Sequence, residues 1–151
     1  MSAEPQVKPQ VKPQWQYASL VSGLGKWAWI FGLINGIIEI IIGLYNIGSG
    51  IALSPFGVGL IGTGVWYIIG AVILIFISFA IIRPKFSNKC AEQDWEALYS
   101  WVLNLGGTKI PWMLIWGIIF TIFSWYYWGG LFVLLPAILL LFMGPRTYNW
   151  S

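Results

Sequence analysis

The stretch Ile110–Met143 contains no charged residue, and this feature most restricts how the chain can fold. A single straight helix of that length would be about 51 Å long, well beyond the hydrocarbon core of about 30 Å. Two further apolar stretches precede it: Trp27–Asn46, in which Glu39 is the only charged residue, and Gly57–Ile82, which has none. The chain is therefore expected to cross a membrane several times.

Composition supports the membrane class. Of the 151 residues, 58% are hydrophobic and only 9% are charged. A soluble domain usually has about 25% charged residues. Too few charges are present to cover the surface of a water-soluble fold, so an integral membrane protein in contact with a lipid bilayer is expected.

The apolar pattern predicts an all-α, polytopic fold in which four transmembrane helices form a bundle. Because Ile110–Met143 is too long for one span, we expect it to turn near Trp125–Gly130, where four aromatic residues precede two glycines. The predicted spans cover residues 27–46, 57–82, 110–126 and 128–144.

The remaining segments complete one transmembrane domain over residues 26–146. Residues 1–25 are expected to form an extended tail, since a Pro-Gln-Val-Lys repeat near its start opposes helix formation. Residues 90–105 show an amphipathic helical period, which predicts a helix lying on the membrane surface and ended by Gly106-Gly107. A short helix packed on the bundle is the alternative. Residues 147–151 are a short C-terminal tail.

Charge placement predicts the orientation. With four spans, all eight basic residues lie on one side, and the two loops on the opposite side have none. The positive-inside rule then places both termini in the cytoplasm and the bundle in the cell membrane. A layout with three spans would move only Arg146.

The first predicted span carries polar and small residues that would lie along one face of a helix. Asn35 and Glu39 recur there at helical spacing with Gly32, Gly36 and Gly43. Small residues at this spacing let membrane helices approach closely, and Gly59 and Gly62 offer a second such surface. One interpretation is that Asn35 and Glu39 form hydrogen bonds between packed helices. The other is a cation or proton site, since an intramembrane acid is a functional-site hypothesis by default.

Other chemistry is poorly supported. Histidine is absent and Cys90 is the only cysteine, so neither a His-based triad nor a thiolate cluster can form. We expect no catalysis, no metal site, no cofactor and no nucleic-acid partner. The tryptophans are typical of an interfacial belt, and those we expect to anchor the protein at the membrane surfaces are Trp95, Trp101, Trp125 and Trp128.

The sequence therefore favours a non-catalytic role. We expect a small packing or assembly subunit that associates with its own copies or with other membrane subunits. The alternative is an oligomeric channel or transporter that moves cations or protons through Glu39.

Overall fold

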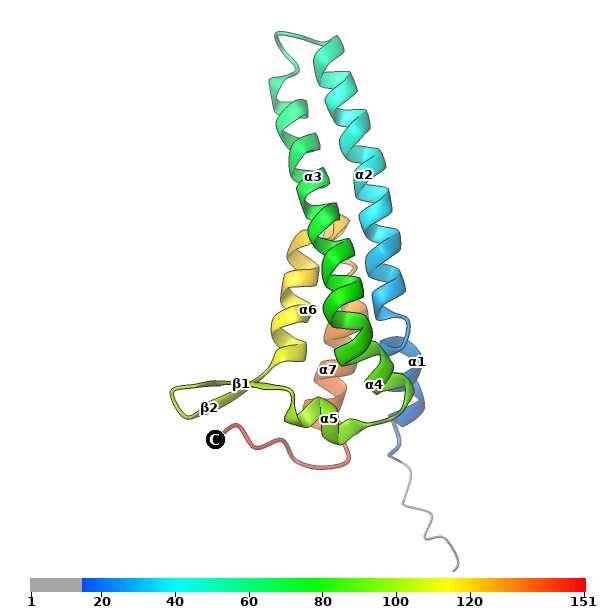
Figure 1. Cartoon of the computed structure of the whole chain (residues 1–151), viewed down its shortest axis with the longest axis vertical. Coiled ribbons are helices and arrows are strands. Elements are labelled where there is room, and N and C mark those ends of the chain that lie inside the picture. Colours follow the sequence, from blue (N-terminus) through cyan, green and yellow to red (C-terminus); the bar gives the residue numbers. More distant parts are fainter. Residues whose placement is uncertain (1–14) are drawn as a thin grey trace, which may run out of the picture.

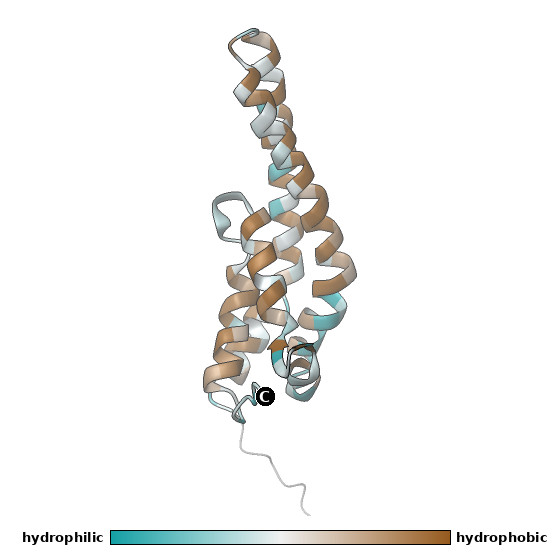
Figure 2. Cartoon of the chain, turned by 90° about the vertical axis from the view of Figure 1, so that its left-hand side faces the viewer, coloured by the Kyte–Doolittle hydropathy of each residue, from teal (hydrophilic) through white to brown (hydrophobic). Residues whose placement is uncertain are grey.

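A computed structural model describes residues 15–151. The repeat at residues 1–14, and with it most of the predicted extended tail, lies outside the described residues. The described chain is mostly helical, which confirms the helical character of the predicted fold. Two antiparallel helical hairpins, α2–α3 and α6–α7, rise from a common base (Figure 1). Hydrophobic residues predominate along these helices (Figure 2).

The taller hairpin pairs α2 (Ala28–Ala52) with α3 (Val58–Ile77). At about 1.5 Å per residue, the 25 residues of α2 extend about 38 Å. Helix α2 continues beyond Asn46, where the first span was expected to end, because nothing between Ile47 and Ala52 interrupts helical hydrogen bonding. The turn is confined to residues 53–57.

Helix α3 does not end at Arg83-Pro84-Lys85 as expected. It continues as a π-helix, η1 (Ser78–Ser87), and then as α4 (Asn88–Ala91). Pro84 lacks a backbone N–H and would clash with the carbonyl four residues earlier in an α-helix. The wider π turn carries the proline without ending the helix.

The segment before α2 corrects the predicted tail. Residues 18–25 form a helix, α1 (Ala18–Gly25), and are not part of an extended tail as predicted. No proline occurs between Trp15 and Gly25, and Val21 is completely buried. The indole N–H of Trp15 donates a hydrogen bond to the carbonyl of Met143 at the end of α7. Helix α1 is therefore part of the base of the fold.

The predicted continuous surface helix over residues 90–105 is wrong: the helix is interrupted at residues 92–94 and ends at residue 100. Helix α5 (Trp95–Ser100) is short, and strands β1 (Val102–Leu105) and β2 (Thr108–Pro111) follow as an antiparallel hairpin. Gly106 and Gly107 have φ of +56° and +89°, the conformation of a tight two-residue hairpin turn. These glycines close a hairpin here instead of ending a helix.

The shorter hairpin pairs α6 (Trp112–Phe123) with α7 (Leu131–Met143), joined through the 3₁₀ turn η2 (Trp125–Tyr127). Helix α6 has 12 residues and α7 has 13, so each extends only about 18–20 Å. The segments Ala18–Ala52, Val58–Ala91 and Trp125–Met143 are long and apolar enough to cross a membrane, but α6 is shorter. Figure 1 shows η2 ending well below the α2–α3 turn.

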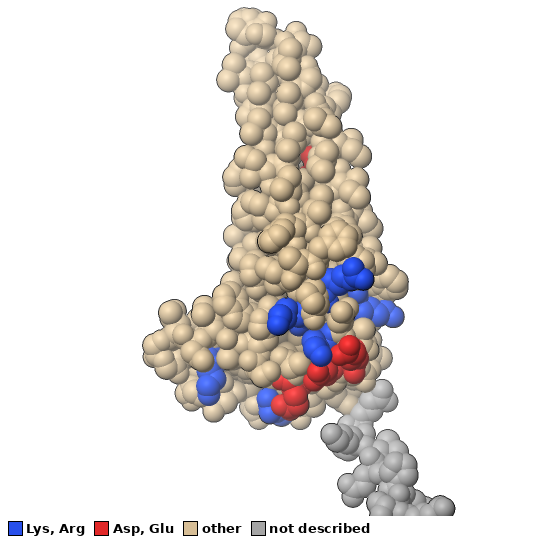
Figure 3. Space-filling view, in the orientation of Figure 1, with Lys and Arg blue, Asp and Glu red and all other residues tan. Residues whose placement is uncertain are grey.

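Charged residues gather at the base (Figure 3). Lys89 forms ion pairs with Glu92 and Asp94, and Arg146 pairs with Glu96. Asp94 also caps α5 by accepting a hydrogen bond from the backbone N–H of Ala97. This hydrogen bond, together with Lys89, holds the pKa of Asp94 below its ordinary value. The hydrophobic core lies just above and includes Leu74, Phe86, Leu98, Met113, Phe120, Val133 and Leu140.

Candidate functional site

Close contact between α2 and α3 is made by glycines. A Cβ atom built on Gly43 would lie 2.8 Å from the carbonyl oxygen of Gly64, and one built on Gly64 would lie 2.5 Å from the carbonyl oxygen of Gly43. A Cβ atom on Gly36 would lie 2.7 Å from Cγ1 of Ile75. A Cβ atom on Gly32 would overlap the side chains of Ser78 and Phe120. The predicted stripe on the first span therefore faces the inside of the fold.

Gly59 and Gly62 do not take part in this contact. A Cβ atom on either residue would meet nothing within 4 Å, and both residues are exposed. Gly57 and Gly64 supply the close approach to α2 instead, because they lie on the opposite face of α3. The prediction that Gly59 and Gly62 pack the first two spans against each other is therefore wrong within this chain.

Glu39 and Asn35 lie one helical turn apart on the buried face of α2. Glu39 is 1% exposed and Asn35 is 0% exposed. The Oε2 atom of Glu39 has no hydrogen-bond partner in the described chain, and neither do Nδ2 and Oδ1 of Asn35. A buried polar group without a partner costs about 1–3 kcal/mol. The sequence-predicted pair is brought together, but the Asn35 amide and Oε2 of Glu39 lack hydrogen bonds in the described chain, and the Glu39 carboxyl contacts the backbone N–H of Trp125 in the tip.

The tip of the α6–α7 hairpin covers this pair, and two glycines make room for it. A Cβ atom on Gly129 would lie 2.8 Å from Nδ2 of Asn35 and would overlap the Ser124 hydroxyl. A Cβ atom on Gly70 would lie 3.3 Å from Oε2 of Glu39. The lack of a side chain at Gly129 therefore lets the tip approach Asn35, and the lack of one at Gly70, on α3, leaves slightly more room for Oε2 of Glu39.

The backbone of the tip is strained. Tyr126 and Tyr127 are two consecutive non-glycine residues with positive φ, at +49° and +61°. Bulky residues rarely adopt this conformation, which costs about 1–3 kcal/mol each. Strain of this kind persists only where surrounding contacts enforce it. Here it turns the chain back toward α7 immediately after Ser124.

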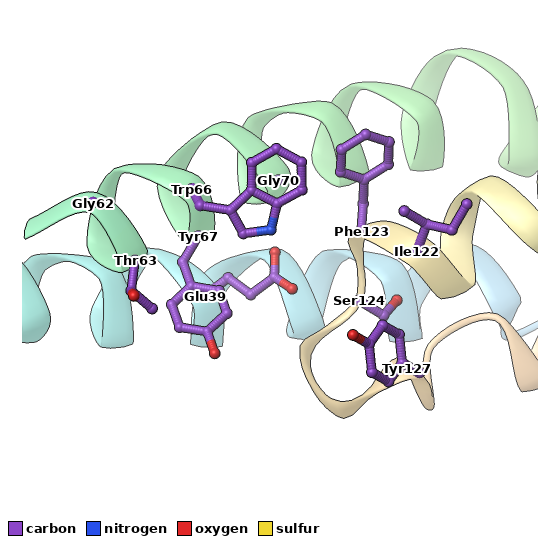
Figure 4. A pocket seen from close by; sticks show the side chains of 10 residues that line it. All are labelled: Glu39, Gly62, Thr63, Trp66, Tyr67, Gly70, Ile122, Phe123, Ser124 and Tyr127. Carbon is purple, nitrogen blue, oxygen red and sulfur yellow. The ribbon is translucent and has the colours of Figure 1, made fainter. Parts of the chain in front are cut away.

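A pocket of about 450 Å³ lies between α3, Glu39 and the tip (Figure 4). The indole of Trp66 and the ring of Phe123 stack across the α3–α6 junction, with centroids 5.8 Å apart. Trp66 and Tyr127 are 53% and 68% exposed, so they form the rim. The lining residues are Glu39, Gly62, Thr63, Trp66, Tyr67, Gly70, Ile122, Phe123, Ser124 and Tyr127.

Among residues 15–151, no cationic side chain lines the pocket. The described lysines and arginines belong to the base segments, and they form no ion pair with Glu39 (Figure 3). Within residues 15–151, no cluster of three or more His, Cys, Asp or Glu residues has the arrangement of a metal site. The pocket therefore presents one carboxyl group among hydroxyl groups and aromatic rings.

The four tryptophans predicted as anchors separate into two pairs. Trp95 packs edge-on against Trp15 at the base, with centroids 5.4 Å apart. Trp101 is half-buried there, and its carbonyl accepts a hydrogen bond from the backbone N–H of Trp112. Trp128 instead contacts Phe31 in the first half of α2, and Trp125 directly follows Ser124 in the tip. Trp125 and Trp128 thus lie below the far end of α2, not beside it as anchors at the far surface would.

Sequence reasoning missed the α3 and tip residues of the pocket. Gly62 was assigned to helix packing, while Thr63, Trp66, Tyr67, Ser124 and Tyr127 were given no site role. Helical spacing of Gly62, Trp66 and Gly70 could have indicated one face of α3. No sequence signal shows that the tip of the second hairpin lies at the level of Glu39.

Comparison with protein-family models, curated proteins and solved structures finds no match for this chain.

Replacing Asn35 should make the protein more stable. The Asn35→Leu variant removes two buried polar groups that lack partners in the described chain and keeps similar volume. The free energy of unfolding should therefore increase by about 1–3 kcal/mol, and the thermal unfolding midpoint in detergent should rise. Asn46→Leu, at a half-buried position on the same helix, is the control and should change the midpoint little. A lower midpoint for Asn35→Leu would show that the amide makes hydrogen bonds that hold the fold together.

Proposed function

We propose that this protein is a small, non-catalytic integral membrane subunit that assembles with its own copies or with larger membrane proteins. The observation that carries the proposal is the outward face of α3 above the α6–α7 tip. Gly59 lies on this face with open space where a side chain would stand, and Gly62, which also lines the pocket beside the tip, has the same open space. Membrane helices associate through such small residues because their backbones can come close together.

The unequal hairpins support this role. Helices α6 and α7 reach only the level of the tip, so the upper part of α3 has no neighbour on that side within the described chain (Figure 1). Exposed apolar residues there include Val58, Leu60 and Val65. A helix from another subunit would lie beside the part of α3 that extends beyond the α6–α7 tip, and it would contact Gly59 closely.

The membrane arrangement in this proposal has two full spans and one re-entrant hairpin. Helices α2 and α3 cross the bilayer. Helices α6 and α7 enter from the base and turn back inside it in this proposal. The whole segment Trp125–Met143 is long and apolar enough to cross, but its first residues form the tip, and α6 and α7 themselves extend only about 18–20 Å against a core of about 30 Å. Both termini then lie on the same side, as they would with four full spans. Lysines and arginines at the base support a cytoplasmic location for that side.

If the protein assembles through this face, a large side chain at position 59 should prevent association with partner helices. The Gly59→Leu variant should lose its oligomer or its co-purifying subunits in mild detergent, while its thermal stability changes little because the new side chain meets nothing within the chain. Gly48→Leu is the matched control, since Gly48 is also exposed and also has open space around it. Size-exclusion chromatography with light scattering and the composition of pull-downs measure the outcome.

Two results would contradict the assembly proposal. One is a wild-type chain that is monomeric and free of partners in mild detergent and in nanodiscs. The other is a Gly59→Leu variant that retains every partner while Gly48→Leu loses them.

Conduction of cations or protons through Glu39 is the second candidate function, and the position of its carboxyl at the pocket favours it. If Glu39 conducts, wild-type protein in liposomes should carry a flux that Glu39→Gln abolishes or alters, because the amide has nearly the same shape but cannot ionise. Flux by Glu39→Gln equal to that of the wild type would exclude a role for this carboxyl in transport.

A further inference from the structure

We propose that the pocket beside Glu39 binds a small organic ammonium ion. This inference concerns a ligand site and does not depend on the assembly role. It rests on three features that meet at one place: a buried carboxyl without a counter-ion among residues 15–151, a wall of aromatic rings, and a volume of about 450 Å³.

The carboxyl supplies the charge that would select a cation. Oε2 of Glu39 is buried and has no hydrogen-bond partner in the part of the chain that the structure describes, and Glu39 lines the pocket. The described cationic side chains gather at the base, where Arg83 lies against Trp29 near the start of α2, and none of them forms an ion pair with Glu39 (Figure 3). An ionised carboxylate in a medium of low dielectric constant needs a partner. A cationic ligand would provide that partner, and its ammonium group could donate to Oε2.

The aromatic rings supply the rest of the recognition. Trp66 and Phe123 stack as a continuous wall, while Tyr67 and Tyr127 line other parts of the same pocket (Figure 4). Ring faces attract alkylated ammonium groups through cation–π interactions and dispersion. A carboxylate surrounded by rings is suited to an ammonium ion whose substituents are apolar.

The same features argue against other ligand classes. A bare metal ion requires several oxygen or nitrogen ligands, and the part of the chain that the structure describes has no metal-type cluster. A neutral lipid chain would gain nothing from Glu39 or from the hydroxyl groups of Thr63 and Ser124. The volume suits a small organic molecule, for which pockets of about 300–1,000 Å³ are typical.

The fold also shows how the pocket is held open. Gly62 lines it and has open space where a side chain would stand, and Gly70 leaves room for Oε2. The positive φ values of Tyr126 and Tyr127 turn the tip so that Ser124 and Tyr127 line the same pocket as Glu39. A site built with strained backbone is consistent with binding instead of packing alone.

The test uses the full-length protein in an uncharged detergent and measures binding of choline by isothermal titration calorimetry. The control ligand is 3,3-dimethyl-1-butanol, which has nearly the shape of choline but carries no charge. The wild type should bind choline at least about tenfold more tightly than the neutral alcohol. Replacing another monovalent salt in the buffer by sodium chloride, at constant ionic strength, should not displace choline.

Three variants assign the binding to this pocket. Glu39→Gln should weaken choline binding by about tenfold or more, since it removes the charge and keeps the shape. Trp66→Ala should weaken it by about threefold to thirtyfold, because one ring face is lost. Trp112→Ala is the matched control, since Trp112 stacks on Trp116 away from the pocket, and it should bind like the wild type. Trp66 is half exposed, so this variant keeps the test valid if Glu39→Gln does not fold.

Several results would overturn the proposal. They are the absence of choline binding to the wild type, equal binding of choline and the neutral alcohol, displacement of choline by sodium ions, and unchanged affinity in both Glu39→Gln and Trp66→Ala. None of these results bears on the Gly59→Leu assembly experiment, so the two proposals can fail separately.

Discussion

The unequal lengths of the two helical hairpins determine what this chain can do. Helix α2 extends about 38 Å and α6 only about 18 Å, so the tip of the second hairpin stops partway along the first. That stopping point covers Asn35 and Glu39, forms one wall of the pocket, and leaves the upper face of α3 open. A longer α6–α7 hairpin would bury Gly59 and Gly62 and would move Ser124 away from Glu39.

The polar residues at this junction oppose stability. The Asn35 amide and Oε2 of Glu39 are buried without hydrogen-bond partners among residues 15–151, and the tip beside them adopts a strained backbone. Close glycine contacts along α2 and α3, at Gly36, Gly43 and Gly64, provide the compensating packing. The closely packed α2–α3 hairpin thus supports the buried polar side chains of α2 and the strained tip beside them. Strained backbone of this kind is often found at binding sites.

Much of the helical architecture could be predicted because apolar composition and helical spacing directly report membrane helices. The glycines that face inward on α2 followed from the same spacing. The β-hairpin at Val102–Pro111 was missed because Gly106-Gly107 can end a helix or close a turn, and only the backbone φ values distinguish these outcomes. The pocket was missed because it depends on where Ser124 and Tyr127 lie relative to Glu39. That distance is set by tertiary packing between segments far apart in the sequence.

Thiol labelling at two exposed aromatic positions most directly tests whether the second hairpin ends inside the bilayer. Phe56, in the α2–α3 turn, is 93% exposed, and Tyr126, in the tip, is 76% exposed, whereas the single native thiol, Cys90, is fully buried. In intact membrane vesicles, Phe56→Cys should react with an impermeant maleimide from the side opposite the base. Tyr126→Cys should react from neither side until detergent is added. Reaction of Tyr126→Cys from the same side as Phe56→Cys would show that α6 and α7 cross the membrane completely and would contradict this account.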